Sequence, residues 1–145
     1  MIRAVLDTNI VVSAHISEFG APSAVLDAFY ARKFRWVTSP SIIDEIETVL
    51  LRPRIQLQTG LPYTEIAEFI SLLKSTTELV SETIQIARVK DDFADNKFLE
   101  CAFEGLAKYI VSGDAHILSI KHYRLVDHVV QTVTADRFLW LLDCY

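Results

Sequence analysis

The sequence predicts an α/β fold in which helices cover both faces of a mostly parallel sheet. Two observations predict it. Short apolar runs that suit buried strands alternate along the chain with longer segments whose apolar residues recur at helical spacing. The 145 residues suit one domain, and a composition of 51% hydrophobic and 23% charged residues supplies a full core and excludes a disordered chain.

The apolar runs predict the strands. The runs at 2–6 and 109–112 are apolar on both faces and should be buried, whereas 77–80 is expected at the sheet edge. The predicted strands are 2–6, 35–38, 77–80, 109–112 and 129–134.

Helical spacing predicts the segments between the strands. Pro22 suits a first helical turn, Ser39 is a good amino cap, and Pro53 cannot continue the helix before it. We expect 54–61 to be a polar connection, while 84–89 is ambiguous. The predicted helices are 10–14, 22–33, 41–51, 62–73, 98–106, 115–120 and 135–142.

Two of the apolar runs end in an aspartate. Asp7 follows the run at 2–6, and Asp114 follows the run at 109–112. A charge where a strand leaves the core is costly unless it is hydrogen-bonded or binds a metal ion. In open parallel sheets, ligands bind beyond the carboxyl ends of the strands. Each aspartate is therefore either a cap of the next turn or part of a site.

The helix at 41–51 carries a third acid near the core. An apolar stripe runs along it, formed by Ile42, Ile43, Ile46, Val49 and Leu50. Asp44 and Glu47 fall on the opposite side, but Glu45 lies at the rim of the stripe. Of these three acids, Glu45 is expected to point closest to the core.

A fourth acid, Asp95, precedes the helix at 98–106. It lies on the line of Leu99, Ala102 and Leu106 and therefore extends the expected buried face at the amino end of the helix. The residues expected to face inward are Phe98, Leu99, Ala102, Phe103 and Leu106, and those expected to face water are Glu100, Glu104 and Lys108.

If the strands before Asp7 and Asp114 are neighbours, Asp7, Glu45, Asp95 and Asp114 converge at one end of the sheet. Carboxylates so close together repel and coexist as anions only with cations between them. Oxygen ligands without a cysteine or histidine partner favour Mg²⁺ or Mn²⁺ over zinc. Such ions suit phosphodiester hydrolysis, because they orient the phosphate, activate water and neutralise the leaving oxygen.

Each acid also has an ordinary explanation. Asp7 and Asp95 are good helix caps, Glu45 suits a solvated helix rim, and Asp114 suits a Gly-Asp turn. These four explanations are independent of one another, whereas a metal site explains all four residues together.

Composition limits the classes of protein. The net charge of −5 counts against a simple nucleic-acid-binding module, but less against a nuclease whose acids hold cations. Cys101 and Cys144 match no metal or CxxC pattern, and Cys101 suits a helix core. With no targeting signal and no apolar stretch that would span a membrane, we expect a reduced, cytoplasmic protein.

The motifs together resemble a known family. Leu6-Asp7-Thr8-Asn9, the helical Glu45, the stretch Asp92-Phe93-Ala94-Asp95-Asn96 and then Ser112-Gly113-Asp114 resemble the PIN-domain nucleases, especially the VapC-type toxin ribonucleases. The resemblance extends from Ile2 to the region of Phe138 and makes the whole of 1–145 a single PIN-like domain.

The resemblance implies a three-layer α/β/α fold with a sheet of about five strands. It implies that Asp7, Glu45, Asp95 and Asp114 bind Mg²⁺ or Mn²⁺ and catalyse the cleavage of RNA by an endoribonuclease, with Asn9 and Ser112 as supporting polar residues. Toxin members usually form homodimers and are blocked by an antitoxin protein. A housekeeping RNA-processing nuclease and a non-catalytic PIN module that binds RNA or protein are the alternatives.

Two departures from the family pattern affect the expected site. Many relatives have an acid where this chain has His116, which bears on a second metal ion, and many have proline where this chain has Phe93. His116 either leans into the site or is an exposed helix residue; we favour the second.

Three cations are candidate RNA contacts, Arg52, Arg54 and Lys97, although solvated surface is the more common role of such residues. The aromatic residues are expected in the core rather than as stacking platforms for bases; these are Phe19, Phe29, Phe98, Phe103 and Tyr109.

Two other enzyme-like classes also place acids after strands. A haloacid-dehalogenase-type phosphatase needs a second acid two residues after the first, where this chain has Asn9. A response-regulator receiver needs adjacent acids after its first strand, and they are missing here.

Overall fold

The computed structural model describes residues 1–86 and 93–144, and all side chains in these ranges except those of residues 93–95. Its elements in chain order are β1 (Arg3–Leu6), α1 (Thr8–Ile16), α2 (Ala21–Tyr30), β2 (Arg35–Thr38), α3 (Pro40–Leu50), α4 (Pro53–Thr59), α5 (Tyr63–Thr76), β3 (Glu78–Leu79), α6 (Phe93–Glu104), β4 (Tyr109–Val111), α7 (Ala115–Leu118), β5 (His122–Leu125), β6 (His128–Val133) and α8 (Ala135–Asp143).

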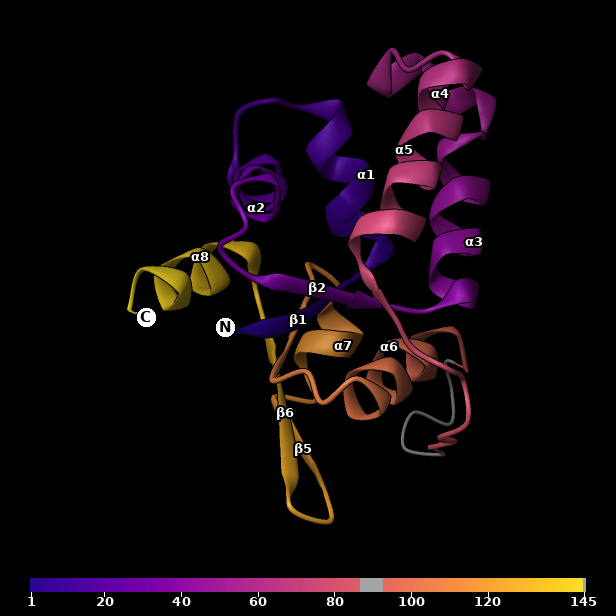
Figure 1. Cartoon of the computed structure of the whole chain (residues 1–145). Helices are drawn as coiled ribbons and strands as arrows, with labels where there is room; N and C mark the ends of the chain where they lie inside the picture. Colours follow the sequence, from indigo (N-terminus) through magenta and orange to yellow (C-terminus); the bar gives the residue numbers. More distant parts are fainter. Residues whose placement is uncertain (87–92, 145) are drawn as a thin grey trace.

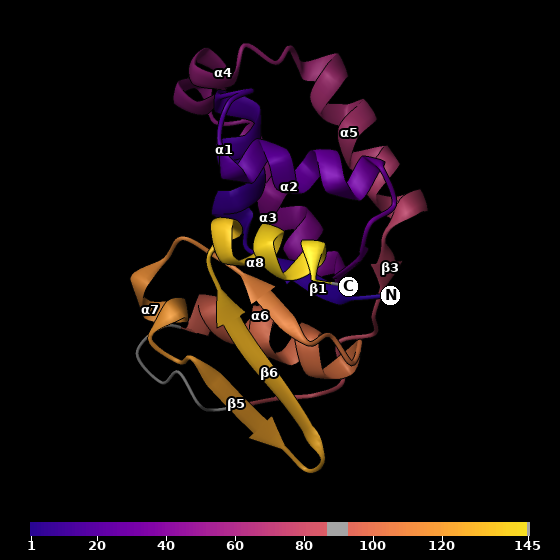
Figure 2. The same cartoon turned by 90° about the vertical axis from the view of Figure 1, so that its left-hand side faces the viewer.

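The strands form one sheet in the order β3-β2-β1-β4-β6-β5. Every pairing is parallel except that of β5 with β6, which is antiparallel. Helices α1, α2 and α3 lie on one side of the sheet and α6 on the other, so the molecule has three layers (Figures 1 and 2). The predicted α/β/α fold is confirmed.

The core lies between these layers and includes the predicted strands. Val5, Ile110 and Trp36 are each at most 1% exposed. Cys101 on α6 is also buried, as expected, and burial raises the pKa of its thiol to about 12. No helix in the part of the chain that the structure describes is long and apolar enough to cross a membrane.

Two elements differ from the sequence prediction. The segment expected to be a polar connection contains α4, which has no buried residue and therefore no apolar stripe to predict it. The sheet has six strands rather than about five, because β5 adds an edge strand that pairs only with β6 and is mostly exposed. Of the ambiguous segment at 84–89, residues 84–86 lie in no helix or strand, and 87–89 lie outside the described residues.

The end of α6 also corrects an expectation. Leu106 was expected to face inward but is 63% exposed. Helix α6 ends at Glu104, and Leu106 takes a left-handed conformation with φ 53°, which turns its side chain outward. Ala107 is buried instead. Gly105 before it is closely packed, because a Cβ there would lie 2.2 Å from Cγ1 of Val37.

Phe19 was likewise expected in the core and is 82% exposed, in the link between α1 and α2. The other aromatic residues of that expectation are buried or packed against the core, namely Phe29, Phe98, Phe103 and Tyr109.

Candidate functional site

The candidate site lies beyond the carboxyl ends of β1 and β4, which are adjacent parallel strands with Leu6 opposite Val111. The next residues, Asp7 and Ser112, therefore leave the sheet side by side. The backbone N–H of Asp7 donates to the carbonyl of Val111 at 2.9 Å, which extends the pairing by one step. The sheet thus fixes the position of both polar residues.

Asp7 is a buried carboxylate, only 4% exposed. One carboxylate oxygen accepts a hydrogen bond from the Ser112 hydroxyl at 2.8 Å, and the other accepts from the Asn9 N–H at 3.4 Å. Asp7 is therefore the amino cap of α1 and also part of the inter-strand site. The cap interpretation and the site interpretation are both compatible with this geometry.

The pKa of Asp7 is raised above its ordinary value. Burial is the largest cause, and the negative charges of Asp114 and Glu45 raise the pKa further. The hydrogen bonds from Ser112 and Asn9 lower it but do not compensate. Asp114 and Glu45 therefore lie near enough to Asp7 for their charges to act on it.

Ser112 connects two of these acids. Its side chain is fully buried; the hydroxyl donates to Asp7 and accepts from the backbone N–H of Asp114 at 2.9 Å. The Asp114 carboxylate accepts from the N–H groups of His116 and Ile117 at 2.7 and 3.3 Å and so caps α7. Asp114, too, combines a capping role with a place beside Asp7.

Glu45 approaches the same site from α3. Its carboxylate accepts a hydrogen bond from the hydroxyl of Thr8 and lies 2.5 Å from the ammonium of Lys97 on α6. Glu45 is half-buried at the helix rim, as the stripe analysis predicted. The contacts with Thr8 and Lys97 hold α1, α3 and α6 together at this edge of the sheet.

Asp95, the fourth predicted acid, lies in the first turn of α6, two residues before Lys97. Its side chain lies outside the described residues, so its predicted convergence with the other acids stays a prediction. The Lys97–Glu45 pair brings this turn of α6 towards α3.

The remaining predicted residues take different places. Asn9 is exposed, and its backbone N–H donates to the Asp7 carboxylate. His116 is exposed, as favoured. Arg52 and Arg54 are exposed at the start of α4, and their proposed role in RNA binding stays a prediction. Lys97, a candidate RNA contact, pairs with Glu45, and its role in RNA binding also stays a prediction.

Thr8 is the polar residue that the sequence interpretation missed. It is 4% exposed, and its hydroxyl is bound to Glu45. The available signal was its place directly after Asp7, where a helix begins and the side chain turns back towards α3.

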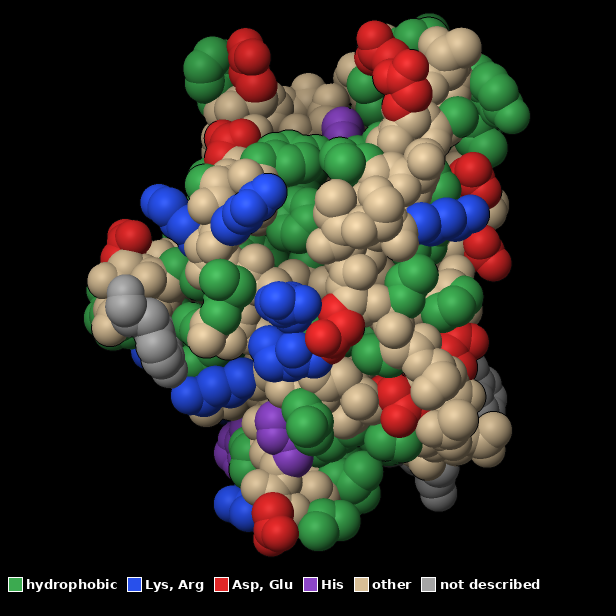
Figure 3. Space-filling model, in the orientation of Figure 1, with side chains coloured by type: hydrophobic (Ala, Val, Ile, Leu, Met, Phe, Trp, Pro, Cys, Tyr) green, Lys and Arg blue, Asp and Glu red, His purple; other side chains and the backbone are tan. Residues whose placement is uncertain are grey.

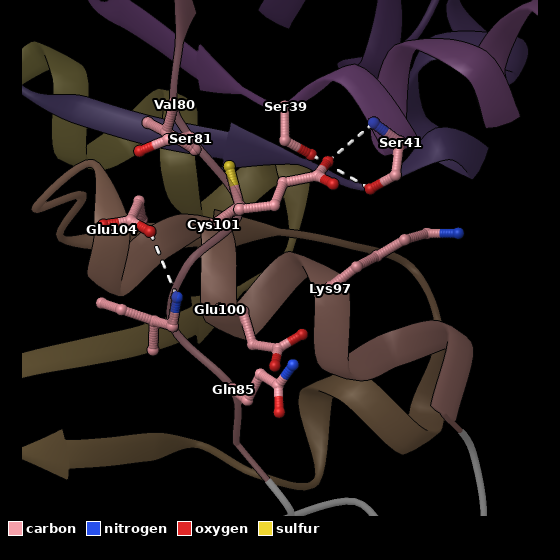
Figure 4. A pocket seen from close by; sticks show the side chains of 11 residues that line it. Ser39, Ser41, Val80, Ser81, Gln85, Lys97, Glu100, Cys101 and Glu104 are labelled. Carbon is pink, nitrogen blue, oxygen red and sulfur yellow. Dashed lines mark hydrogen bonds between the residues drawn. The ribbon is translucent and has the colours of Figure 1, made fainter.

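A second group of carboxylates lies nearby and is organised differently (Figure 4). Glu104 accepts hydrogen bonds from the N–H and hydroxyl of Thr83 and from the N–H of Ile84. Glu100 accepts from the N–H of Ile86, and Glu82 accepts from the N–H of Ser41 at 2.8 Å. We call Glu82, Glu100 and Glu104 the loop carboxylates, because they hold the segment 82–86 against α3 and α6.

The loop carboxylates correct the expectation that Glu100 and Glu104 simply face water. Both are only half-exposed and bind backbone N–H groups. Lys108, the third residue of that expectation, is exposed, with its ammonium over the Tyr109 ring. Figure 4 shows Lys97 extending away from Glu100 and Glu104, consistent with its pairing with Glu45.

Among the described residues, no group of three or more His, Cys, Asp or Glu side chains is placed to hold a metal ion. That search does not include the side chain of Asp95. The donors that are present at the site are carboxylate and hydroxyl oxygens, which suit Mg²⁺ or Mn²⁺ rather than a softer metal.

Comparison with known proteins places the chain in a family. A model of the PIN domain matches residues 3–116, a range that includes all four predicted acids. The uncharacterized protein MJ1680 of Methanocaldococcus jannaschii is 31% identical over 120 residues, covering 83% of this chain and 76% of that protein. The chain belongs to the PIN-domain family, whose members are generally nucleases that use divalent metal ions and bind RNA.

Proposed function

We propose that this protein is a metal-dependent endoribonuclease that hydrolyses RNA phosphodiester bonds, with residues 1–145 as one nuclease domain. The observation that carries the proposal is the buried Asp7 carboxylate at the end of β1, which the Ser112 hydroxyl links to the backbone of Asp114 after the neighbouring strand β4. Burial, and to a lesser degree the charges of Asp114 and Glu45, raise the pKa of Asp7. Like charges gathered in a buried position are costly for folding and are therefore typical of functional sites.

A divalent cation is the ligand that we propose for these residues. Asp7 and Asp114 follow neighbouring strands, and the charge of Glu45 also acts on Asp7. A cation there would stabilise the ionised form of Asp7, whose pKa is raised mainly by burial and further by the charges of Asp114 and Glu45. We propose that Asp7, Asp114, Asp95 and Glu45 hold Mg²⁺ or Mn²⁺, which supplies an activated water and neutralises charge on the scissile phosphate.

The other residues position these acids. Ser112 orients the Asp7 carboxylate and anchors the backbone of Asp114 through the same hydroxyl. Thr8 and Lys97 hold opposite oxygens of Glu45. Each Glu45 oxygen therefore already has one partner and keeps a second lone pair for a cation.

Cleavage of a labelled mixture of RNAs in Mn²⁺ or Mg²⁺ tests the proposal. We expect Asp7→Asn to lower the cleavage rate by about a hundredfold or more, because loss of a charged ligand exceeds the 10–100-fold typical of residues around a metal site. Asp44→Asn is the matched control, because Asp44 is exposed on α3 and should leave cleavage unchanged.

Equal cleavage by wild type and Asp7→Asn would contradict the mechanism. Binding of RNA without cleavage in either metal, together with no Mn²⁺ binding in calorimetry, would instead favour the non-catalytic PIN module.

We further propose that the protein acts in the cytoplasm as the toxin of a toxin–antitoxin pair, as a homodimer that an antitoxin protein blocks. The support is the resemblance of its motifs to toxin ribonucleases. Induced expression in a bacterial host should arrest growth, and Asp7→Asn should not. Normal growth with active ribonuclease in the cell extract would favour a housekeeping nuclease instead.

A further inference from the structure

A second concave surface lies at the opposite end of the sheet from the carboxylates. It is a cleft of about 440 Å³ between α2, the start of β2 and α5. Its walls include Phe29 and Tyr30 from α2, Trp36 from β2, and Leu72 and Thr76 from α5. The cleft is thus built from aromatic side chains on one side and the surface of α5 on the other.

The aromatic side is a connected cluster around Phe29. The Phe29 ring lies 5.7 Å from Tyr30, 6.0 Å from Phe34 and 5.2 Å from Trp36 between ring centroids. Tyr30 is 51% exposed, whereas Trp36 is fully buried. The indole Nε1 of Trp36 has no hydrogen-bond partner among the described residues. The cluster therefore has a rigid floor and one accessible ring.

Arginines also line the cleft. Arg32 and Arg35 belong to its wall, and Arg35 is paired in register with Arg3 on β1. Arg32 forms no ion pair with any described residue, whereas Arg3, Arg35 and Lys97 each do. Arg3 and Arg35 share the single acid Glu78, which is 3.9 Å from the Arg35 guanidinium. Positive charge is thus in excess here, although the chain has a net charge of −5.

The basic residues continue beyond this cleft. Arg3 and Lys108 line a neighbouring hollow of about 410 Å³ at the amino ends of the strands. In Figure 3, several Lys and Arg side chains lie at the centre and to the left of this face, beside one acidic side chain, with apolar surface above the central ones. Basic side chains beside the exposed Tyr30 ring suit a polyanion that also carries flat rings.

We propose that the cleft is a second RNA-binding site, in which a base of a single-stranded segment stacks on Tyr30 while its phosphates contact Arg32 and Arg35. Aromatic rings combined with a basic track are how proteins bind single strands without base specificity. The choice of RNA as the polyanion rests on the proposed nuclease function. The four residues of β1, at about 3.3 Å each, place the cleft roughly 13 Å from the carboxylates.

Two other occupants fit less well. An acidic peptide would pair with the arginines but would leave the exposed Tyr30 ring without a stacking partner. A second copy of the chain, docked here about a two-fold axis, would bring Arg32 and Arg35 against the same patch of its partner. Like charges would then face each other, which is unfavourable.

The fluorescence of Trp36 tests the site without requiring cleavage. The chain has two tryptophans, so Trp140→Phe leaves Trp36 as the single reporter. The probe is a short oligouridylate RNA, titrated in excess EDTA to prevent hydrolysis. Saturable quenching or a shift of the Trp36 emission is expected.

Substitutions then locate the contacts. In the Trp140→Phe background, the double variant Arg32→Gln with Arg35→Gln and the single variant Tyr30→Leu should each weaken binding by about tenfold, in line with the loss of one stacked base or a few phosphate contacts. The matched control is Arg124→Gln with Lys121→Gln, which removes the same charge at or next to β5. The control should bind RNA like its parent.

Absence of saturable RNA binding, measured both by Trp36 emission and by the anisotropy of a labelled oligouridylate, would overturn the proposal, as would equal affinities of the arginine and control variants. A change of oligomeric state in the arginine variant, with RNA affinity unchanged, would make the cleft an interface between copies and would also overturn it. Failure of the proposed nuclease function is distinct: RNA would bind in EDTA, with the expected loss in the variants, but would not be cut in Mn²⁺.

Discussion

The molecule has two groups of acids that differ in their surroundings. The site carboxylates are Asp7, Glu45 and Asp114. The loop carboxylates are Glu82, which follows β3, and Glu100 and Glu104, which lie on α6. Asp7 is buried among like charges, and its pKa is raised. Glu82 and Glu104 lie at the surface, and hydrogen bonds from Ser41 and Thr83 lower their pKa values. The sign of the pKa shift separates acids that are costly to the fold from acids that support it.

This difference indicates what each group is for. Backbone N–H donors satisfy the loop carboxylates and thereby fix the segment 82–86. The fold stabilises the Asp7 carboxylate less well. The hydrogen bonds from Ser112 and Asn9 lower its pKa by less than burial and the two neighbouring charges raise it. A carboxylate left in this state stabilises a bound cation more than it stabilises the fold.

Removing the charge of Glu45 should give a large functional effect. We expect Glu45→Gln to lower RNA cleavage by about 10–100-fold, because it alters a proposed ligand held by Thr8 and Lys97. Glu47→Gln, two residues along the same helix, is the matched control and should cleave like wild type. If the two variants lose activity equally, Glu45 does not belong with the site carboxylates.

Loss of the Ser112 hydroxyl should have a smaller effect of a different kind. Ser112→Ala removes the hydrogen bond that lowers the pKa of Asp7. We expect about a tenfold loss of cleavage and a shift of the acid limb of the pH–rate profile to higher pH. A uniform loss of rate with an unshifted pH profile would mean that Ser112 acts only through packing.

The loop carboxylates should affect stability rather than cleavage. Glu104→Ala removes the acceptor of three hydrogen bonds from Thr83 and Ile84, so the melting temperature should fall at neutral pH. Because the folded-state pKa of Glu104 is lowered, its contribution is present above the ordinary carboxyl pKa and is lost as pH falls through the folded value. Thermal melts across the acid range measure this, and per-molecule cleavage by the folded variant should match wild type.

The effect of Asp7 on stability should depend on pH in the opposite direction from that of Glu104, and the change in melting temperature should be smaller. Its raised pKa means that stability falls as pH rises from the ordinary carboxyl value through the folded value, and the loss is complete above that. In metal-free buffer at neutral pH, Asp7→Asn should therefore melt at a slightly higher temperature than wild type, and the gain should vanish in acid. A lower melting temperature for Asp7→Asn at neutral pH would mean that the fold, rather than a ligand, uses the charge.

The sequence predicted the elements that have a buried face. The apolar strand before Asp7, the stripe that places Glu45 at a rim and the buried strand before Ser112 all lie as expected. These patterns exist because burial constrains side chains on both faces of a central strand and on one face of a helix.

Exposed elements were missed for the same reason. Helix α4 buries no side chain, and β5 is an exposed edge strand, so neither carries an apolar period. The remaining signal for α4 was Pro53 at its first position and Gly60, which has φ 71°, just beyond its end. Leu106 fits the helical spacing in the sequence, but α6 ends two residues before it.

The side-chain pairing within the site could not be predicted from the sequence either. Lys97 was a candidate RNA contact with solvated surface as its more common role, and nothing in the sequence indicated its pairing with Glu45, which is 52 residues away in the chain. Spacing along one helix predicts which face a residue occupies, but not which residue of another helix faces it. The same limit applies to the contact between Thr8 and Glu45.

The most direct test of the cation site is calorimetric titration of Mn²⁺ into wild type, Asp7→Asn and Asp44→Asn, without RNA. We predict saturable Mn²⁺ binding by wild type and Asp44→Asn and at least about tenfold weaker binding by Asp7→Asn. The same metal should raise the melting temperature of the two binding proteins only. Equal Mn²⁺ affinity in all three proteins would contradict the assignment of Asp7 to a cation site.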